Sequence, residues 1–157
     1  MALLPRLCAF ARTMLKDAEG ARDLVQEAAT RALAARRVPE DAPAYRAWMF
    51  RIVRNAALDE LRRKPHQAYE DHAPVDLWTF DESRIAKITV DQALATLPSV
   101  HREIISLIDI AGFTYSEAAE LLNVPIGTIM SRIARGRSAL LAAIETSSVR
   151  PLKSRHG

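Results

Sequence analysis

Four polar side chains in the last third of the sequence recur at helical spacing, and they are the residues best suited to form hydrogen bonds with another molecule. One side of a helix would carry them at i, i+3, i+4 and i+7: Thr128, Ser131, Arg132 and Arg135. Arginine can donate two hydrogen bonds to guanine O6 and N7, and serine or threonine can bond bases or phosphates. Surface arginines most often serve solubility. A face that is merely solvated usually carries both positive and negative side chains, however, and no Asp or Glu occurs from Asn123 to Leu141. The stripe therefore predicts contact with DNA, and Arg137, further round the helix, is assigned to a phosphate.

Two short helices joined by a tight turn are predicted to present this stripe. Thr114 and Glu117 have the spacing of a capping box, so the first helix begins at Tyr115. Asn123 tolerates a left-handed conformation and Pro125 prevents a continuous helix, so the second helix begins at about Ile126. The residues expected to face inward are Ala118, Ala119 and Leu122 from the first helix, and Ile126, Ile129, Ile133 and Leu140 from the second. This is the pattern of a helix-turn-helix, whose second helix lies in the DNA major groove.

Three further helices are predicted in the N-terminal half from apolar residues at helical period. The first has its apolar face at Leu7, Phe10, Ala11, Met14 and Leu15. After a turn at 17–20, the second runs from about 21 to 35 and is expected to bury Leu24, Val25, Ala28, Ala32 and Leu33. The third runs from about 44 to 63 with a buried stripe of Tyr45, Trp48, Met49, Ile52, Val53 and Ala56.

Two of these helices also carry charged faces. The basic face of the third helix comprises Arg51, Arg54, Asn55, Arg62 and Arg63. It fits a surface that follows a nucleic-acid backbone, although Asp59 and Glu60 nearby would also suit an ordinary solvated face. The second helix carries Asp23, Gln26 and Glu27 opposite its apolar face, where they are either solvated or a docking surface for a basic partner.

The fold class that follows is all-α, with two small helical domains joined by a flexible acidic linker. The expected boundaries are 1–64 for the first domain, 65–86 for the linker, 87–146 for the second domain with the helix-turn-helix, and 147–157 for a disordered tail. Net charge supports this division, because residues 1–64 carry +5, residues 65–98 carry −4 and residues 99–157 carry +2.

Cysteine content and hydropathy indicate the compartment. Cys8 is the single cysteine, so an internal disulfide is impossible, which fits a reducing cytoplasm. No run approaches the ~20 apolar residues of a transmembrane helix, and no secretion signal is recognisable, so we expect a cytoplasmic protein without membrane insertion.

Three motifs, taken in their order and spacing, resemble the extracytoplasmic-function (ECF) sigma factors of bacterial RNA polymerase. They are "DLVQEAATRAL", "YRAWMFRIVRNAALDELRR" and "GFTYSEAAELLNVPIGTIMSRIARGRSAL". The resemblance covers about residues 3–64, as domain 2 of that family, and 87–145, as domain 4. It implies a transcription initiation factor that binds core RNA polymerase, recognises −35 and −10 promoter elements and helps to open the DNA.

The resemblance also implies a role for each group of residues. Asp23, Gln26 and Glu27 match the surface that docks on the β′ clamp helices, and domain 4 would meet the β flap. The basic face of the third helix matches the part that reads the −10 element, where the loop 36–43 would hold a flipped base. The −35 element would be read by Thr128, Ser131, Arg132, Arg135 and Arg137. An anti-sigma factor is the expected regulator, and no cofactor or metal is expected.

Other classes of function remain as alternatives. An enzyme is disfavoured, because the chain has no glycine-rich phosphate loop, no H-E-x-x-H, no C-x-x-C and no nucleophile elbow. A helix-turn-helix regulator that acts without polymerase would account for residues 112–145 but leave the N-terminal half unexplained. A sigma-like mimic that sequesters an anti-sigma factor would not need its DNA contacts, yet both basic faces are intact.

Overall fold

The computed structural model of the protein describes residues 3–63 and 90–148, and within these two ranges every regular element is a helix. The N-terminal elements are α1 (Leu3–Leu15), α2 (Ala18–Ala34) and α3 (Ala42–Arg63). After helical residues 90–96 come α5 (Ser99–Ile105), the π-helix η1 (Ser106–Ile110), α6 (Tyr115–Leu122) and α7 (Ile126–Ser148). The predicted all-α class is confirmed, while the linker 65–86 and all but the first two residues of the predicted tail 147–157 lie outside the described residues. None of the described helices has both the length and the apolar character needed to cross a bilayer.

The first three helices pack on one another around the apolar face predicted for α1. Leu7, Phe10, Ala11 and Met14 are buried as expected, and α1 contacts both α2 and α3. The ring of Phe10 meets that of Phe50 edge to face, with centroids 5.5 Å apart. Phe50 was not among the residues predicted to face the core, although it is completely buried.

Aspartate caps start two helices earlier than the sequence pattern indicated. The Asp17 carboxylate accepts hydrogen bonds from the amides of Glu19 and Gly20, so α2 begins at Ala18 and residues 18–20 of the expected turn are already helical. In the same way the Asp41 carboxylate accepts from the Ala44 amide at 3.0 Å, and α3 begins at Ala42. The two helices therefore begin three and two residues before the starts at about 21 and 44 that periodicity predicted.

Leu33 was predicted to be a core residue of α2, and that prediction is wrong. Its side chain is 89% exposed, whereas Ala32 is buried. Successive helical residues are about 100° apart, which places Leu33 on the stripe that also carries Gln26 and Thr30, at i, i+4 and i+7. The helix therefore turns this leucine to the same outer side as its predicted docking residues.

The C-terminal helices form a second group of packed elements, with α7 lying on both α5 and α6. Ile129 and Ile133 are buried as predicted, but Ile126 is 50% exposed and does not belong to the apolar core. Side chains on a helix lean toward its N-terminus, so the first residue of α7 points back past the end of its own helix. Ile126 is therefore a correction to the predicted inner stripe.

Gly136 lies where α7 packs closely on α5. A Cβ built on this residue would stand 3.4 Å from the side chain of Ile105 and 3.5 Å from the carbonyl oxygen of His101. A glycine inside a helix costs about 1 kcal/mol relative to alanine, and here its small size lets the two helices pack without a side chain between them.

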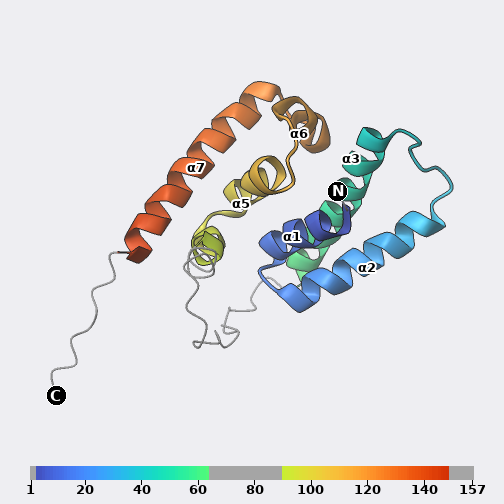
Figure 1. Cartoon of the computed structure of the whole chain (residues 1–157), viewed down its shortest axis with the longest axis horizontal. Helices are drawn as coiled ribbons and strands as arrows, with labels where there is room; N and C mark the ends of the chain where they lie inside the picture. The colour runs from blue at the N-terminus through green and yellow to red at the C-terminus, as the bar shows by residue number, and fades with distance from the viewer. Residues whose placement is uncertain (1–2, 64–89, 149–157) are drawn as a thin grey trace, which may run out of the picture.

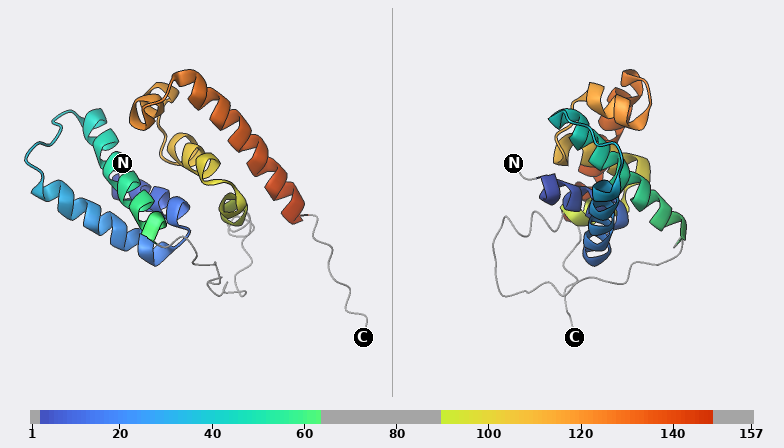
Figure 2. Two further views of the ribbon diagram at one scale, coloured as in Figure 1. Left: turned by 180° about the vertical axis from the view of Figure 1, so that it is seen from behind. Right: turned by 90° about the vertical axis from the view of Figure 1, so that its right-hand side faces the viewer.

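Both groups of helices share one apolar core. Figures 1 and 2 show α2 and α7 at opposite edges of the molecule, with α1 and α5 between them. α1 contacts both α5 and η1, and α3 contacts α6. Phe50 of α3 and Phe113, which precedes α6, meet edge to face with their ring centroids 4.9 Å apart. The predicted division into two helical units is therefore accompanied by direct packing of one unit on the other.

Candidate nucleic-acid interface

The helix-turn-helix forms as predicted, because its two boundary residues adopt the conformations that their chemistry favours. The Thr114 hydroxyl accepts a hydrogen bond from the Glu117 amide, and the Thr114 amide donates to the Glu117 carboxylate at 3.0 Å. The backbone hydrogen bond from Thr114 is the main cause that lowers the pKa of Glu117, so this carboxylate stays ionised at the N-terminus of α6. Asn123 has φ of 53° and ends α6 in the left-handed conformation that asparagine tolerates.

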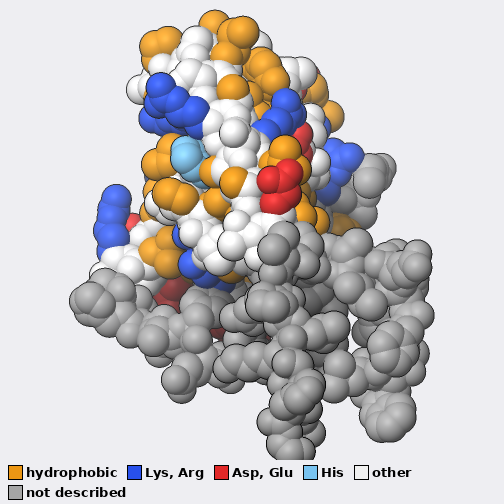
Figure 3. Space-filling view, turned by 90° about the vertical axis from the view of Figure 1, so that its left-hand side faces the viewer, with side chains coloured by type: hydrophobic (Ala, Val, Ile, Leu, Met, Phe, Trp, Pro, Cys, Tyr) orange, Lys and Arg blue, Asp and Glu red, His pale blue; other side chains and the backbone are white. Residues whose placement is uncertain are grey.

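Because of the turn at Asn123 and Pro125, the predicted polar stripe of α7 faces the outside of the molecule. Ser131 and Arg135 are exposed, and Thr128 and Arg132 are half-buried. Within residues 3–63 and 90–148, none of these four side chains has a hydrogen-bond or ion-pair partner, so both guanidiniums keep their donors for an external acceptor. Figure 3 shows Lys and Arg side chains interspersed with apolar ones on the side of the molecule where α7 lies.

Arg137 differs from the stripe because it has an internal partner. Its guanidinium donates two hydrogen bonds to the Asp109 carboxylate, at 2.6 and 3.1 Å. These bonds are the main cause that raises the pKa of Arg137, and they tie α7 to η1. The π-turn that carries Asp109 is closed by the Ala111 amide, which donates to the Ser106 carbonyl at 2.8 Å. The predicted phosphate contact of Arg137 stays a prediction, and any such contact has to compete with Asp109.

The second basic face lies along α3, and its residues also differ in whether they are exposed or bound to another helix. Arg51, Asn55, Arg62 and Arg63 are exposed. Among the described residues, Arg62 and Arg63 make loose ion pairs within the helix, to Asp59 at 3.5 Å and to Glu60 at 3.9 Å. Arg54 is instead bonded to Glu103 of α5. Three arginines of this face are therefore open to solvent, while the fourth faces the other group of helices.

The predicted docking residues of α2 are exposed on one face of the helix. Asp23, Gln26 and Glu27 all reach solvent, and Glu27 forms an ion pair with Arg31 one turn away, at 2.6 Å. Asp23 and Glu27 also line a shallow hollow of about 280 Å³, whose other acidic residues are Asp17, Glu19 and Glu60. This concentration of carboxylates makes the face negatively charged, as the prediction of a basic partner requires.

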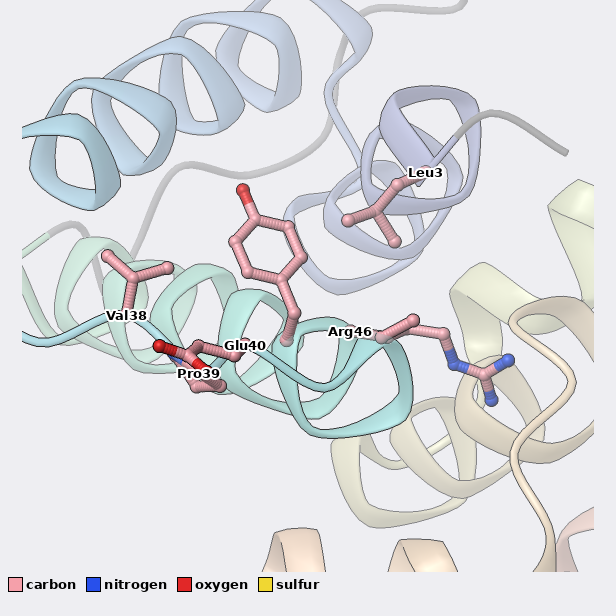
Figure 4. A pocket seen from close by; sticks show the side chains of 7 residues that line it. Leu3, Val38, Pro39, Glu40 and Arg46 are labelled. Atoms are coloured by element: carbon pink, nitrogen blue, oxygen red, sulfur yellow. The ribbon is translucent and has the colours of Figure 1, made fainter.

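A second hollow, of about 560 Å³, lies between the loop before α3 and the N-terminus of α1. It is lined by Leu3, Val38, Pro39, Glu40, Ala42, Tyr45 and Arg46. Figure 4 shows Val38, Pro39 and Glu40 on the loop, with Arg46 directed away toward the C-terminal helices. From the sequence, Tyr45 was predicted only as part of the buried stripe of α3, and Leu3 was not predicted to lie near this loop. The aromatic ring next to the loop could have been noticed, because Tyr45 follows it by two residues.

The fold and these faces define an all-helical DNA-binding protein with a helix-turn-helix, and comparison with known proteins identifies its family. The model of Sigma-70 region 2 matches residues 1–66, and that of Sigma-70 region 4 matches residues 87–140. The chain is 32% identical to the ECF RNA polymerase sigma factor EcfG of Rhodopseudomonas palustris, over 92% of this chain and 82% of that protein. It is 29% identical to the ECF sigma factor SigW of Bacillus subtilis, over 81% of this chain and 76% of that protein.

Solved structures also resemble most of the chain, and two of them show its class. The sigma factor RpoE, solved in complex with the anti-sigma factor NepR from Bartonella quintana, matches with a TM-score of 0.75 and 30% identity, covering 91% of this chain and 92% of that one. CnrH, solved in complex with the cytosolic domain of CnrY, matches with a TM-score of 0.66 and 26% identity, over 90% and 81% of the two chains. The chain belongs to the Sigma-70 family, in its ECF group, and it is a transcription initiation factor of bacterial RNA polymerase.

Proposed function

We propose that this chain directs core RNA polymerase to its promoters by reading the −35 element with α7 and the −10 element with α3 and the loop before it. The observation that carries the proposal is the polar stripe of α7, which faces outward after the capped helix α6 and its turn and has no partner among the described residues. Hydrogen-bond donors of this kind are what direct readout in the major groove requires. No bond-making step is needed for such a role, so we propose that the protein is not an enzyme.

For the −35 element, Arg132 and Arg135 supply the base contacts, and Thr128 and Ser131 supply hydrogen bonds to bases or phosphates. Arg132 and Arg135 lie about one turn apart on the same side of α7, so both can enter one groove together. Met130 is 53% exposed and offers apolar contact but no charge to the DNA.

For the −10 element, the exposed residues of α3 follow the phosphate backbone and the hollow beside the loop holds a base of the non-template strand. Arg51, Asn55, Arg62 and Arg63 provide the polar contacts. Tyr45 lines the hollow and offers the aromatic face on which an unstacked base can lie, a contact worth about 1–3 kcal/mol per base. An unstacked base has to be held for the strands to stay apart, so this hollow is our candidate for the site that supports opening.

For the polymerase, we propose that the acidic face of α2 binds the clamp helices of β′ and that the C-terminal helices bind the β flap. Asp23 and Glu27 supply charge, and Leu33 supplies an exposed apolar side chain on the same stripe as Gln26. An anti-sigma factor is the proposed regulator, because RpoE and CnrH, which this chain resembles over most of its length, were solved in complexes with the anti-sigma factor NepR and with CnrY. A protein with these partners works in the cytoplasm.

Footprinting with and without core polymerase, together with run-off transcription, tests the proposal. We expect protection of both elements only in the presence of core polymerase. The double reversal Asp23→Lys and Glu27→Lys should reduce pull-down of core polymerase and leave thermal unfolding unchanged, because both side chains lie outside the core. The matched control is Arg22→Glu, another exposed charge reversal on α2.

Other results of these experiments would favour a different function or a different docking face. Strong protection of duplex DNA by the chain alone would favour a helix-turn-helix regulator that acts without polymerase. Binding of an anti-sigma factor with no transcription at any promoter would favour a mimic. Unchanged core binding by the double reversal would show that the docking face is elsewhere.

A further inference from the structure

Two large apolar side chains at the start of α7 reach solvent. Ile126 is 50% exposed and Met130 is 53% exposed, and neither belongs to the apolar core or packs against it. They are four residues apart, so they adjoin on one side of the helix, which we call the apolar flank. Single apolar residues on a surface are ordinary, whereas two neighbouring ones form a patch that contact with another molecule would remove from water.

The apolar flank lies across the helix from Thr128 and Arg132 of the polar stripe. Each of these polar residues follows a member of the apolar pair by two positions, which is about 200° round a helix. The ridge between the two sides is open at Gly127, where an added Cβ would have no neighbouring group within 4 Å. The start of α7 therefore presents an open ridge with an apolar side and a hydrogen-bonding side.

The place of this ridge in the fold suits a DNA groove. Figure 1 shows α7 beginning next to α6, on the outer side of the C-terminal helices. A helix with its side chains is about 10–12 Å wide, and the major groove is about 12 Å wide. A recognition helix meets base edges with its N-terminal residues, and Ile126 and Met130 lie in the first five residues of α7. Both sides of the ridge therefore face base edges when α7 lies in the groove.

The chemistry of the apolar flank restricts which base it can meet. At base edges in the major groove the apolar group is the 5-methyl of thymine, whereas cytosine places its N4 amino donor there. The side chains of Ile126 and Met130 have no oxygen to accept from this donor, and no Asp or Glu occurs from Asn123 to Leu141. A cytosine against this flank would lose a hydrogen bond to water without gaining another, while a thymine would gain an apolar contact.

The surroundings of the apolar flank favour DNA over a protein as its occupant. Every charged residue of α7 before Glu145 is an arginine, so this part of the helix attracts phosphates. The apolar flank also adjoins the polar stripe on the same two turns of α7, so a duplex bound by the stripe comes within reach of the flank. A protein partner is an outcome that the experiment below separates from DNA.

We propose that Ile126 and Met130 read thymine methyl groups in the −35 element, so that this protein selects thymine over cytosine at the bases they meet. The pair spans about 6 Å along the helix axis, or about two base-pair steps of ~3.4 Å. The apolar flank thus specifies one or two thymines, beside the guanines that arginines recognise. This inference rests on the proposed function of α7 and adds a readout that the polar stripe does not supply.

Deoxyuridine tests the contact, because it pairs as thymine does and lacks only the 5-methyl group. Promoters would first be selected by run-off transcription, with core polymerase and the full chain, from a library randomised across the −35 element. Each thymine of the selected element, on either strand, would then be replaced singly by deoxyuridine, and promoter binding by the holoenzyme would be measured. We expect binding to fall about three- to fivefold at one or two positions, which is the effect of burying roughly one methyl group.

Protein variants assign the methyl contact to the apolar flank. Met130→Gln keeps the length of the side chain but makes it polar, and Ile126→Ala shortens it, so each should bring the thymine-to-deoxyuridine binding ratio at its position close to one. Met130→Leu should keep the ratio, because the side chain stays apolar. The matched control is Leu141→Ala, since Leu141 is 58% exposed on the same side of α7 but about 16 Å further along the helix. It should leave the ratio unchanged.

Equal binding of thymine and deoxyuridine promoters at every position, or selected −35 elements without thymine, would overturn the proposal. So would a methyl effect that survives in both Met130→Gln and Ile126→Ala, because another group would then read the methyl. Weaker pull-down of core polymerase by these variants, with no methyl effect in the wild type, would show that the flank binds protein. If the wild-type holoenzyme selects no −35 sequence at all, the proposed function of α7 fails and the inference fails with it.

Discussion

At the scale of single residues, the partners of three α7 arginines separate their roles. Arg132 and Arg135 have no partner among the described residues, whereas Arg137 is held by Asp109. We predict that Arg132→Ala or Arg135→Ala costs about 1–3 kcal/mol in promoter binding and relaxes the preference at one −35 position. A transcription grid of promoter variants against protein variants measures this. Equal loss at every promoter, with base preference unchanged, would show that α7 only holds the DNA backbone.

Asp109 provides a test of whether Arg137 contacts DNA. If Arg137 binds a phosphate, Arg137→Ala should weaken all promoters about equally and lower the salt slope of binding by about one. Asp109→Ala removes the same ion pair but releases the guanidinium, so binding should be unchanged or stronger. Identical effects of the two substitutions would show that Arg137 serves only to hold α7 on η1.

Burial distinguishes two isoleucines that the sequence treats alike. Ile133 is 2% exposed, and we predict that Ile133→Ala lowers the free energy of unfolding by about 2–5 kcal/mol through the cavity that it leaves. Ile126→Ala, at the exposed start of α7, should cost less than about 1 kcal/mol. Chemical denaturation of both variants measures the difference, and equal losses would mean that α7 is rotated relative to this structure.

At the scale of elements, the capping box of α6 predicts a dependence on pH. The pKa of Glu117 is lowered from its ordinary value of 4.5, so its charge stabilises the folded state above that value, and this contribution is lost as the pH falls through the lowered pKa. Glu117→Gln keeps an acceptor for the Thr114 amide but removes the charge. We therefore expect the stability difference between wild type and Glu117→Gln to be constant near pH 7, to shrink as the pH falls below 4.5 and to disappear below the lowered pKa. Urea unfolding at several pH values measures it, and a difference that persists at low pH would contradict this origin.

The contact between α5 and α7 predicts opposite effects for two substitutions of Gly136. Alanine would meet Ile105 at 3.4 Å, an ordinary contact distance, and it should gain most of the ~1 kcal/mol of helix propensity that glycine forgoes. We expect Gly136→Ala to raise the melting temperature by roughly 2–4 °C, and Gly136→Leu to lower it by forcing the two helices apart. A lower melting temperature for Gly136→Ala would show that α5 cannot yield even slightly.

At the scale of the whole molecule, the small size of each of the two basic faces predicts weak binding to free DNA. Only one small basic face at a time can meet a duplex, so we expect a Kd weaker than about 1 µM at physiological salt, with little difference between promoter and scrambled DNA. The affinity should also fall steeply between 50 and 200 mM salt. Fluorescence anisotropy with both duplexes measures this, and tight, sequence-specific binding without polymerase would contradict the sigma-type function.

Most helices and the turn that positions α7 were predictable because their causes are local. Apolar residues at helical period fix which face of α1 is buried, and hydrogen bonds between neighbouring residues fix the caps of α6. Asn123 adopts its left-handed conformation for a reason contained in its own side chain. The outward direction of Ser131 and Arg135 then follows from spacing alone, so the proposed −35 stripe could be named from the sequence.

Tertiary structure decided every feature that depends on what lies opposite a residue. Ile126 satisfies the helical period but lies where no other helix of the described residues covers it, and the period of one segment carries no information about where neighbouring helices end. The pairing of Arg54 with Glu103 joins residues far apart in the sequence, and nothing local distinguishes Arg54 from Arg51. The packing of the two halves is decided in the same way, because the burial of Phe50 and Phe113 depends on a contact that neither segment makes alone.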